Sequence, residues 1–368
     1  MRRSLLPALV ALTAAASPAA AQTLAQRLLP DPRDPITRVG TRGANFLEFG
    51  VGARAHALAG ATTALAEGAA ALYWNTAGAA GVQGIHGAFS YAELFDAGIT
   101  HTFAGVLLPV GQGAVGFSFI NFSSGDIPRT TERWPAGGDP VAGNTFQWNA
   151  SAFGLHYARN ITDRLAFGGA VKYAQEGIEL AKATYVGVDL GTRFRTGLYG
   201  VTIGASLSNV GSAGTMRGQA VERKLTPQSA QNQFGPSRAV EFQFRTHRAD
   251  MPTVFRFGLQ TELLGGPDAL IRPDPRNRVV FAADITDGID TDIQSAVGFE
   301  YSFRELLYVR GGKRWFNELK APWDFTDGLS AGFGLRLPAL GRKLAFDYAY
   351  TGMGELRNVQ VFSFEFGF

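Results

Sequence analysis

Apolar and polar residues alternate along most of the chain from about residue 85 onwards. In residues 292–303, Ile293 and Phe299 fall on one parity and Glu300 falls on the other, and in Phe362–Phe368 every second residue is phenylalanine. Successive side chains leave opposite faces of an extended strand, so a repeat of two residues indicates a strand with one apolar and one polar face. This part of the chain is therefore predicted to be built from β-strands.

Applied along the sequence, the alternation predicts fourteen strands of roughly ten residues each. The predicted strands are 85–92, 99–109, 114–122, 145–158, 165–176, 184–195, 200–208, 253–264, 278–286, 292–303, 306–316, 328–337, 343–351 and 358–368. Short turns follow the even-numbered strands at 110–113, 160–164, 196–199, 304–306 and 339–342, and longer loops follow odd-numbered strands at 123–144, 209–252 and 317–327. One turn after an even-numbered strand, 264–277, is longer than this rule predicts.

Strand length and aromatic placement favour a membrane barrel over a soluble β-sandwich or solenoid, which remain the alternatives. A tilted strand needs about 9 to 11 residues to cross a bilayer, whereas ordinary strands average about 5 to 6. Aromatic residues recur near the strand ends, where an interfacial girdle would place them: Tyr91, Trp148, Tyr157, Tyr173, Trp315, Phe316 and Tyr350. The predicted fold class is all-β, a transmembrane antiparallel β-barrel of about fourteen strands over residues 85–368, with a small N-terminal helical or irregular plug.

The first 21 residues have the pattern of a secretory signal peptide. Arg2 and Arg3 precede the apolar run 5–16, and three alanines at 19–21 form a cleavage-site pattern before Gln22. We therefore expect export through the general secretion route to an outer membrane of Gram-negative type. The chain contains no cysteine, so neither a disulfide nor a thiolate metal site is available.

Residues 22–84 precede the first predicted strand and do not alternate. Residues 45–84 are rich in alanine, and 53–71 are predicted to form one or two short helices interrupted at Gly60 and Gly68. The sequence "WNTAG" at 74–78 is typical of a turn. This segment is expected either to pack on the periplasmic face or to fill the barrel as a plug, since a barrel of this size leaves a wide lumen.

The stretch "FLEFGVGARAHALAGATTALAEGAAALYWNTAGAAGV" resembles the N-terminal signature of the PorV/PorQ family of outer-membrane proteins, relatives of the FadL-type fatty-acid transporters. The matching positions are Gly50, Ala53, Arg54, Ala55, Ala57, Leu58, Gly60, Ala61, Tyr73, Trp74, Asn75, Ala77 and Gly78. The chain departs from the pattern at Ala59, at Thr76 and in the acidic stretch, where it reads "AEGAAA".

The resemblance implies a non-enzymatic protein that assists type IX-like protein secretion and the delivery of cargo to the cell surface. Secretion-machinery or cargo proteins would then bind the loops 123–144 and 209–252, where 239–245 could form a hairpin. The alternative that it implies is a FadL-like transporter of hydrophobic small molecules. The residues implicated in plugging or gating are Arg54, Gly60, Tyr73, Trp74, Asn75, Thr76, Ala77 and Gly78.

The polar faces of the predicted strands carry charges of both signs. Alternation directs into the lumen Lys172, Asp189, Arg193, Arg195, Arg256, Glu262, Glu300, Arg310, Arg314 and Asp347. We expect these side chains to pair across the lumen and anchor the plug, and guiding a solute is the alternative. The formal charge of +3 includes Arg2 and Arg3, so the mature chain gives no reason to expect a nucleic-acid partner.

No cofactor or catalytic motif is recognisable. The five histidines are scattered, with no i, i+4 pair to suggest a metal site. Asp284, Asp287, Asp290 and Asp292 are expected in an outer loop as a solvated acidic turn, with calcium binding as the alternative, because they lack the spacing of a calcium loop. No nucleophile, P-loop or dinucleotide motif appears, although sequence alone does not exclude a hydrolase site at a barrel rim.

Overall fold

The computed structural model describes residues 40–141, 143–225, 240–244, 246–316, 326–339 and 342–367. Contacts divide the chain into two units, 1–38 and 39–368, and all described residues lie in the second. The expected signal peptide at 1–21 lies outside the described residues, as do the C-terminal Phe368 and most of the predicted loop 317–327.

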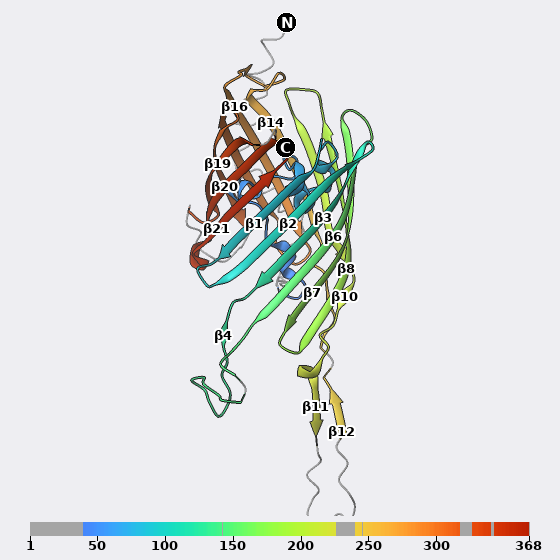
Figure 1. Ribbon diagram of the computed structural model, residues 1–368, viewed down its shortest axis with the longest axis vertical. Helices are drawn as coiled ribbons and strands as arrows, with labels where there is room; N and C mark the ends of the chain where they lie inside the picture. The colour runs from blue at the N-terminus through green and yellow to red at the C-terminus, as the bar shows by residue number, and fades with distance from the viewer. Residues whose placement is uncertain are drawn as a thin grey trace, which may run out of the picture. The chain divides into compact units, whose positions relative to one another are not determined.

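Fourteen long antiparallel strands form a closed barrel, which confirms the predicted fold class (Figure 1). They are β1 (His86–Leu94), β2 (Ile99–Val110), β3 (Gly113–Ser123), β6 (Trp148–Asn160), β7 (Leu165–Ile178), β8 (Ala181–Arg195), β9 (Thr202–Gly211), β14 (Val254–Gly265), β16 (Asn277–Gly288), β17 (Gln294–Phe303), β18 (Leu307–Phe316), β19 (Leu329–Ala339), β20 (Arg342–Gly352) and β21 (Asn358–Phe366). Each strand pairs with its neighbours in this order, and β21 pairs with β1 to close the ring, with Ser363 opposite Ser90. A closed ring leaves no unpaired edge, which is the condition for a sheet to stand in lipid.

Among the described residues, seven shorter strands lie in the connections. They are β4 (Ile127–Pro128), β5 (Thr145–Phe146), β10 (Ala213–Gly214), β11 (Glu222–Leu225), β12 (Val240–Gln243), β13 (Ala249–Asp250) and β15 (Arg272–Pro273). β4 pairs with β5, β10 with β13 and β11 with β12, while β15 lies parallel to the end of β14. The hairpin expected within 239–245 is thus one strand of a ribbon whose other strand lies upstream, at 222–225.

The outer face of the barrel is apolar. On β6, Phe153, Leu155 and Tyr157 are each about half exposed, and on β21 Phe362 and Phe364 are each 42% exposed. Residues of the opposite parity on the same strands, such as Ala152, are buried inside. A ring of exposed phenylalanine, leucine and tyrosine around all strands is the outward band of a transmembrane barrel. Among the described residues, no helix is long and apolar enough to cross a membrane.

The two ends of the barrel differ. One end, called the turn end below, carries the connections after β2, β6, β8, β14, β17 and β19, together with the start of β1 and the end of β21. The other, the loop end, carries the connections after β1, β3, β7, β9, β16, β18 and β20. Four of the seven loop-end connections are short: 95–98 after β1, Glu179 and Leu180 after β7, 289–293 after β16 and 353–357 after β20.

The acidic group expected in an outer loop is therefore divided. Asp284 and Asp287 belong to β16, whose ladder with β17 extends to Thr286, and only Asp290 and Asp292 lie in the connection. Asp284 is 4% exposed and points into the lumen, so the prediction of one solvated acidic turn was wrong. The alternation continues through "DITDG", and the aspartate takes the lumen side of the strand.

The segment before β1 lies inside the barrel (Figure 1). It forms η1 (Asn45–Glu48), α3 (Ala53–Ala57), η2 (Gly68–Ala70), α4 (Ala71–Trp74) and η3 (Thr76–Ala79). It enters at the loop end, where the Gly43 amide donates to the Asp250 carbonyl at 2.9 Å, and leaves at the turn end, where Asn160 Nδ2 donates to the Ala80 carbonyl at 3.3 Å. Residues 44–84 thus run the length of the lumen and are called the N-terminal segment below.

The helices of this segment are shorter than predicted. α3 ends at Ala57, because Ala59 (φ 55°) and Gly60 (φ 89°) adopt left-handed backbone conformations that stop a helix. The wall fixes this break, since Arg314 Nε of β18 donates to the Ala59 carbonyl at 2.9 Å. Tertiary hydrogen bonds therefore override the helical propensity of the alanines that follow.

Candidate functional site

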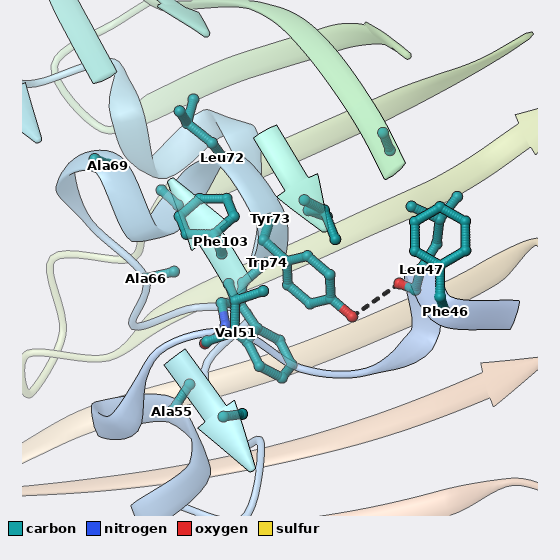
Figure 2. Close-up of a cluster of buried hydrophobic side chains, with 14 of the residues drawn as sticks. Phe46, Leu47, Val51, Ala55, Ala66, Ala69, Leu72, Tyr73, Trp74 and Phe103 are labelled. Carbon is teal, nitrogen blue, oxygen red and sulfur yellow. Dashed lines mark hydrogen bonds between the residues drawn. The ribbon is translucent and has the colours of Figure 1, made fainter. Parts of the chain in front are cut away.

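An apolar layer lies between the N-terminal segment and one side of the barrel wall. Leu72 of the segment and Phe103 of β2 are buried close to each other (Figure 2), and a Cβ at Gly105 of β2 would meet both side chains. These residues belong to one continuous cluster of buried apolar side chains. We call this layer the apolar seam, and its members include Phe46, Leu47, Val51, Leu72, Leu94, Phe103, Leu107, Ile120 and Phe122.

Aromatic rings widen the apolar seam at the loop end. Phe49 lies 5.4 Å from Phe122 between ring centroids, and Phe122 lies 5.0 Å from Trp148 in an edge-to-face arrangement. Phe95 and His101 complete the group, at 6.4 Å and 6.2 Å from Phe49. Phe49, Phe95 and Trp148 are only partly buried, so the loop end of the apolar seam approaches the surface.

Two aromatic residues of α4 form hydrogen bonds to earlier residues of the N-terminal segment. Tyr73 Oη donates to the Leu47 carbonyl at 2.9 Å, and Trp74 Nε1 donates to the Val51 carbonyl at 2.9 Å (Figure 2). Burial raises the pKa of Tyr73 to about 12, so this hydroxyl keeps its proton and remains a donor. Arg256 of β14 stacks over both rings, 5.6 Å from the Tyr73 centroid and 5.5 Å from that of Trp74.

The turn after α4 is fixed by Asn75, which is 2% exposed. Its Nδ2 donates to the carbonyls of Thr63 and Thr192, both at 2.9 Å, and its Oδ1 accepts from the Ala77 amide at 3.2 Å. This side chain therefore caps η3 and also bonds the segment to β8. The wall residue next to this side chain is Gly191, and it leaves room for Asn75, because a Cβ at this position would lie 2.2 Å from Asn75 Oδ1.

The other side of the lumen holds a buried ion-pair network. Arg54 of α3 donates from Nε and Nη2 to the two carboxylate oxygens of Glu300, both at 2.8 Å. Glu300 also accepts from Arg310 Nε at 2.6 Å, and Arg310 Nη1 donates to Asp347 at 2.6 Å. Arg336 donates to the same Asp347 oxygen at 2.9 Å. The network thus fastens α3 to β17, β18, β19 and β20.

Two further polar contacts hold the middle of the segment. Asp284 Oδ2 accepts the amides of Thr62 at 3.0 Å and Thr63 at 2.8 Å. Glu67 accepts from Arg193 Nη2 at 2.6 Å. Burial alone would raise the pKa of Glu67, but the guanidinium groups of Arg193 and Arg54 outweigh it and lower that pKa.

The structure brings most of the singled-out residues into these contacts. Arg54, Tyr73, Trp74, Asn75, Thr76, Ala77 and Gly78 lie in the lumen, where Thr76 Oγ1 is 3.4 Å from His156 Nδ1. Gly60 lies against Arg314, and a Cβ there would be 2.6 Å from Nη2. Among the expected lumen charges, Arg193, Arg256, Glu300, Arg310 and Asp347 are buried, whereas Arg195 is exposed at the turn end.

Sequence reasoning missed three partners in these contacts: Glu67, Asp284 and Arg336. Asp284 was assigned to a loop, Glu67 was regarded only as part of a degenerate acidic stretch, and Arg336 was not singled out. Along β19, Arg336 falls on the same parity as Gly334 and on the other parity from Leu335. This alternation would have indicated that Arg336 faces the lumen. The partners of these residues depend on how the ring closes, which no local pattern contains.

A cavity of about 730 Å³ opens at the turn end, between the N-terminal segment and the wall. Its lining is charged and includes Arg54, Glu67, Arg193, Glu300, Arg336 and Glu365. A second cavity, of about 540 Å³, lies at the loop end beside β5 and is lined by Arg129, Gln147 and Glu179. In the part of the chain that the structure describes, no group of histidine, aspartate and glutamate side chains suits a metal ion.

Several solved structures share this architecture, and three of them are described as transporters or a channel. The toluene transporter TbuX of Ralstonia pickettii matches 86% of this chain and 97% of its own at 11% identity and a TM-score of 0.51. The toluene transporter TodX of Pseudomonas putida matches 86% and 96% at 12% identity and 0.52, and so does the monoaromatic hydrocarbon channel CymD. No protein-family model matches the chain, and no curated protein matches it.

These likenesses show a shared fold, that of outer-membrane barrels with fourteen strands. Identity of 11% to 12% is too low to carry a substrate from one protein to another. The narrower resemblance to the PorV/PorQ family stays a prediction from the N-terminal motif.

Proposed function

We propose that this protein is a non-enzymatic outer-membrane transporter that passes hydrophobic small molecules through the barrel, with residues 44–84 as its plug. The apolar seam is the proposed route, and the ion-pair network on the opposite side holds the plug against the wall.

The observation that carries this proposal is the division of the lumen into two sides. Within the described residues, the lumen faces of β1, β2, β3 and β6 carry no aspartate, glutamate, lysine or arginine. The buried lumen ion pairs of the described wall residues lie on other strands, from β7 and β8 round to β20. An apolar solute that passes a charged side chain displaces water from that charge, which costs free energy. The side of the lumen without charges is therefore the favourable path.

The loop-end aromatic rings are suited to first contact with such a solute. Phe49, Phe122 and Trp148 offer ring faces and edges at the partly exposed mouth of the apolar seam. The three structural neighbours described above are a toluene transporter, a second toluene transporter and a monoaromatic hydrocarbon channel. Their shared architecture supports an apolar aromatic or aliphatic solute for this barrel as well.

The apolar seam is closed in this conformation. Leu72 packs so closely on the wall that a Cβ at Gly116 would lie 2.6 Å from its Cδ2. Passage therefore requires the plug to shift away from β2 and β3. Arg54, Gly60 and the turn Asn75–Gly78 are the proposed hinge and anchor residues, because each is held by the wall opposite the apolar seam or at its turn end.

Uptake measurements test the proposal. Cells that lack their own hydrocarbon transporters and express this chain should take up radiolabelled toluene faster than cells carrying an empty vector, with no gain for a hydrophilic solute of similar size. Ile120→Glu, which places a carboxylate in the apolar seam at a position 4% exposed, should remove that gain, while Ile120→Leu should keep it. Equal toluene uptake with and without the folded barrel would refute the proposal.

A role in protein secretion is the second candidate, favoured by the loop end. Residues 124–147 and 212–253 are much longer than the other loop-end connections and contain the paired strands β4–β5 and β11–β12. Such ribbons offer surfaces on which a secretion-machinery or cargo protein could dock. Cross-linking in cells should then capture secreted proteins through residues of these two loops, and capture of none, together with measured solute uptake, would leave transport alone.

A further inference from the structure

Arginines lie directly beyond the outward apolar residues at the turn end. On β6, Arg159 follows Leu155 and Tyr157 on the lipid-facing parity. On β20, Arg342 precedes Leu344 and Phe346 on that parity. At the β17–β18 turn, Arg304 lies over the ring of the outward-facing Phe303, with its Cζ 5.3 Å from the ring centroid. All three arginines are exposed.

At the loop end, two strands carry a carboxylate in the equivalent place, and β8 carries Lys182 there. On β1, Glu93 follows Phe89 and Tyr91 on the outward parity. On β16, Asp287 follows Ile285, which is 52% exposed. Both carboxylates are exposed, and neither forms an ion pair within the described residues. The charges that border the apolar band are thus of both signs at the loop end, whereas those on β6, β20 and the β17–β18 turn at the turn end are arginines.

The turn-end arginines make few hydrogen bonds to the described residues. Arg159 Nη2 donates to Gln112 Oε1 at 3.1 Å, and Arg342 Nη1 donates to the Ile85 carbonyl at 2.8 Å. No described carboxylate pairs with Arg159, Arg304 or Arg342. A guanidinium carries five N–H donors, so most donors of these three side chains have no acceptor among the described residues.

Few acids offset these cations at the turn end. Glu305 pairs with Lys343 at 3.3 Å, and Asp274 accepts the amides of Arg276 and Asn277 at 2.8 Å. Arg272 pairs with Asp274 at 3.9 Å, and Asp163 and Asp268 remain against the further exposed cations Arg164, Arg195 and Arg276. The rim of the turn end is therefore net positive.

The position of these arginines along the membrane normal determines which part of the lipid they contact. A side chain one position beyond the apolar band of a barrel reaches the headgroup layer, where the phosphates of phospholipids lie. Guanidinium binds phosphate through paired hydrogen bonds, and each cation near an anionic surface adds about 1 kcal/mol of attraction. The acids at the loop end would be repelled by the same headgroups.

We propose that the turn end of the barrel binds anionic phospholipid headgroups through Arg159, Arg304 and Arg342, so that the protein prefers a bilayer whose turn-end leaflet is anionic. This inference requires only that the barrel spans a membrane, and it stands apart from the solute that the barrel passes.

Lipid retention tests it on the mature chain. The purified protein is equilibrated with a detergent mixture of phosphatidylglycerol and phosphatidylcholine, and the lipids that remain bound are counted by native mass spectrometry. Wild type should be enriched in phosphatidylglycerol. The triple variant Arg159→Gln, Arg304→Gln, Arg342→Gln should lose at least about tenfold of that enrichment, and the corresponding triple lysine variant should retain most of it.

A matched control removes the same charge from the other end. Arg133, Arg217 and Arg357 are exposed at the loop end, and their triple glutamine variant should keep the wild-type enrichment. The single variant Arg304→Gln, whose only described side-chain contact is the ring of Phe303, provides the test if the triple variant fails to fold. Equal retention of both lipids by wild type, or equal loss in the turn-end and loop-end variants, would overturn the proposal.

Discussion

Arg54 and Glu300 form a two-point ion pair inside the barrel, with both nitrogen-to-oxygen distances at 2.8 Å, although 246 residues separate them in the chain. The planar guanidinium and carboxylate match each other in this geometry, which fixes orientation as well as distance. Because Glu300 also accepts from Arg310, the pair joins the plug to the network of the wall. The N-terminal segment is thus held by charge on one side and by apolar packing on the other.

Removing the shared carboxylate should loosen the plug. Glu300→Gln leaves Arg54 and Arg310 without their common counter-ion, and Glu300 is only 2% exposed. Loss of one partner from a buried ion pair costs roughly 3 to 5 kcal/mol, since an uncompensated charge remains in a poorly solvated place. Urea unfolding of the barrel in detergent, followed by its mobility shift on unboiled gels, should show a loss of this size.

The control for this prediction is a nearby surface pair. Glu305 lies 3.3 Å from Lys343, and the two side chains are 60% and 49% exposed. Glu305→Gln should change stability by less than about 1 kcal/mol, because water screens such pairs. Similar losses in the two variants would mean that the buried network does not hold the plug.

A single methyl group should displace the turn at 75–78. A Cβ at Gly191 would lie 2.2 Å from Asn75 Oδ1, and this oxygen is fixed by its bond from the Ala77 amide. Gly191→Ala should cost about 1 to 3 kcal/mol as an overpacked contact and expose the segment to limited proteolysis. At Gly169, on the neighbouring strand, a Cβ would meet nothing closer than 3.4 Å, so Gly169→Ala should leave both measurements near wild type.

Stability should fall as pH rises through the titration of Glu48. Burial and the charge of Asp290 raise the pKa of Glu48 to about 7 from its usual 4.5, with Arg256 opposing them in part. A carboxyl whose folded-state pKa exceeds its unfolded value favours folding below about pH 4.5, and that advantage is lost between about 4.5 and 7. The accumulated difference is roughly 3 kcal/mol.

Comparison with Glu48→Gln isolates this effect. His56 titrates in the same range with the opposite sign, since burial lowers its pKa to about 4, so wild type alone would show a mixture. The unfolding free energy of Glu48→Gln minus that of wild type should be larger at pH 8 than at pH 4.5. A constant difference across this range would show that the pKa of Glu48 is not raised in the folded protein.

Much of the fold could be predicted because it is a local property of the chain. Alternation assigns each strand and the face of each residue, and thus the lumen side of Glu300 and Asp347 as well as the lipid side of Phe362. The fourteen strands and their connection order are confirmed to within a few residues. Register and ring closure remain hidden, because they arise between strands far apart in sequence.

The contacts within the site could not be predicted from the sequence, because they form only when the barrel closes. Which arginine meets Glu300 depends on the position of α3 relative to β17, and alternation states only that both face inward. The helices predicted within 53–71 are shorter than expected for the same reason: Asp284 and Arg314 of the wall bond to the backbone at 59–63, and these bonds outweigh the propensity of alanine. The acidic residue Asp284 was placed in a loop because the aspartates around it resemble turn residues.

The most direct test of a moving plug is a reversible lock between plug and wall. The chain has no cysteine, and the Ala53 amide lies 3.1 Å from Ser363 Oγ, so Ala53→Cys with Ser363→Cys can join α3 to β21. The matched control, Ser330→Cys with Thr351→Cys, joins two opposed wall residues whose hydroxyl oxygens are 3.1 Å apart, and it leaves the plug free.

The measurement is toluene uptake by cells bearing each double variant, before and after reduction, with disulfide formation checked by mass spectrometry. The account predicts that the oxidised Ala53–Ser363 lock stops uptake, that reduction restores it, and that the control pair transports in both states. Undiminished uptake through the fully oxidised plug lock would contradict it.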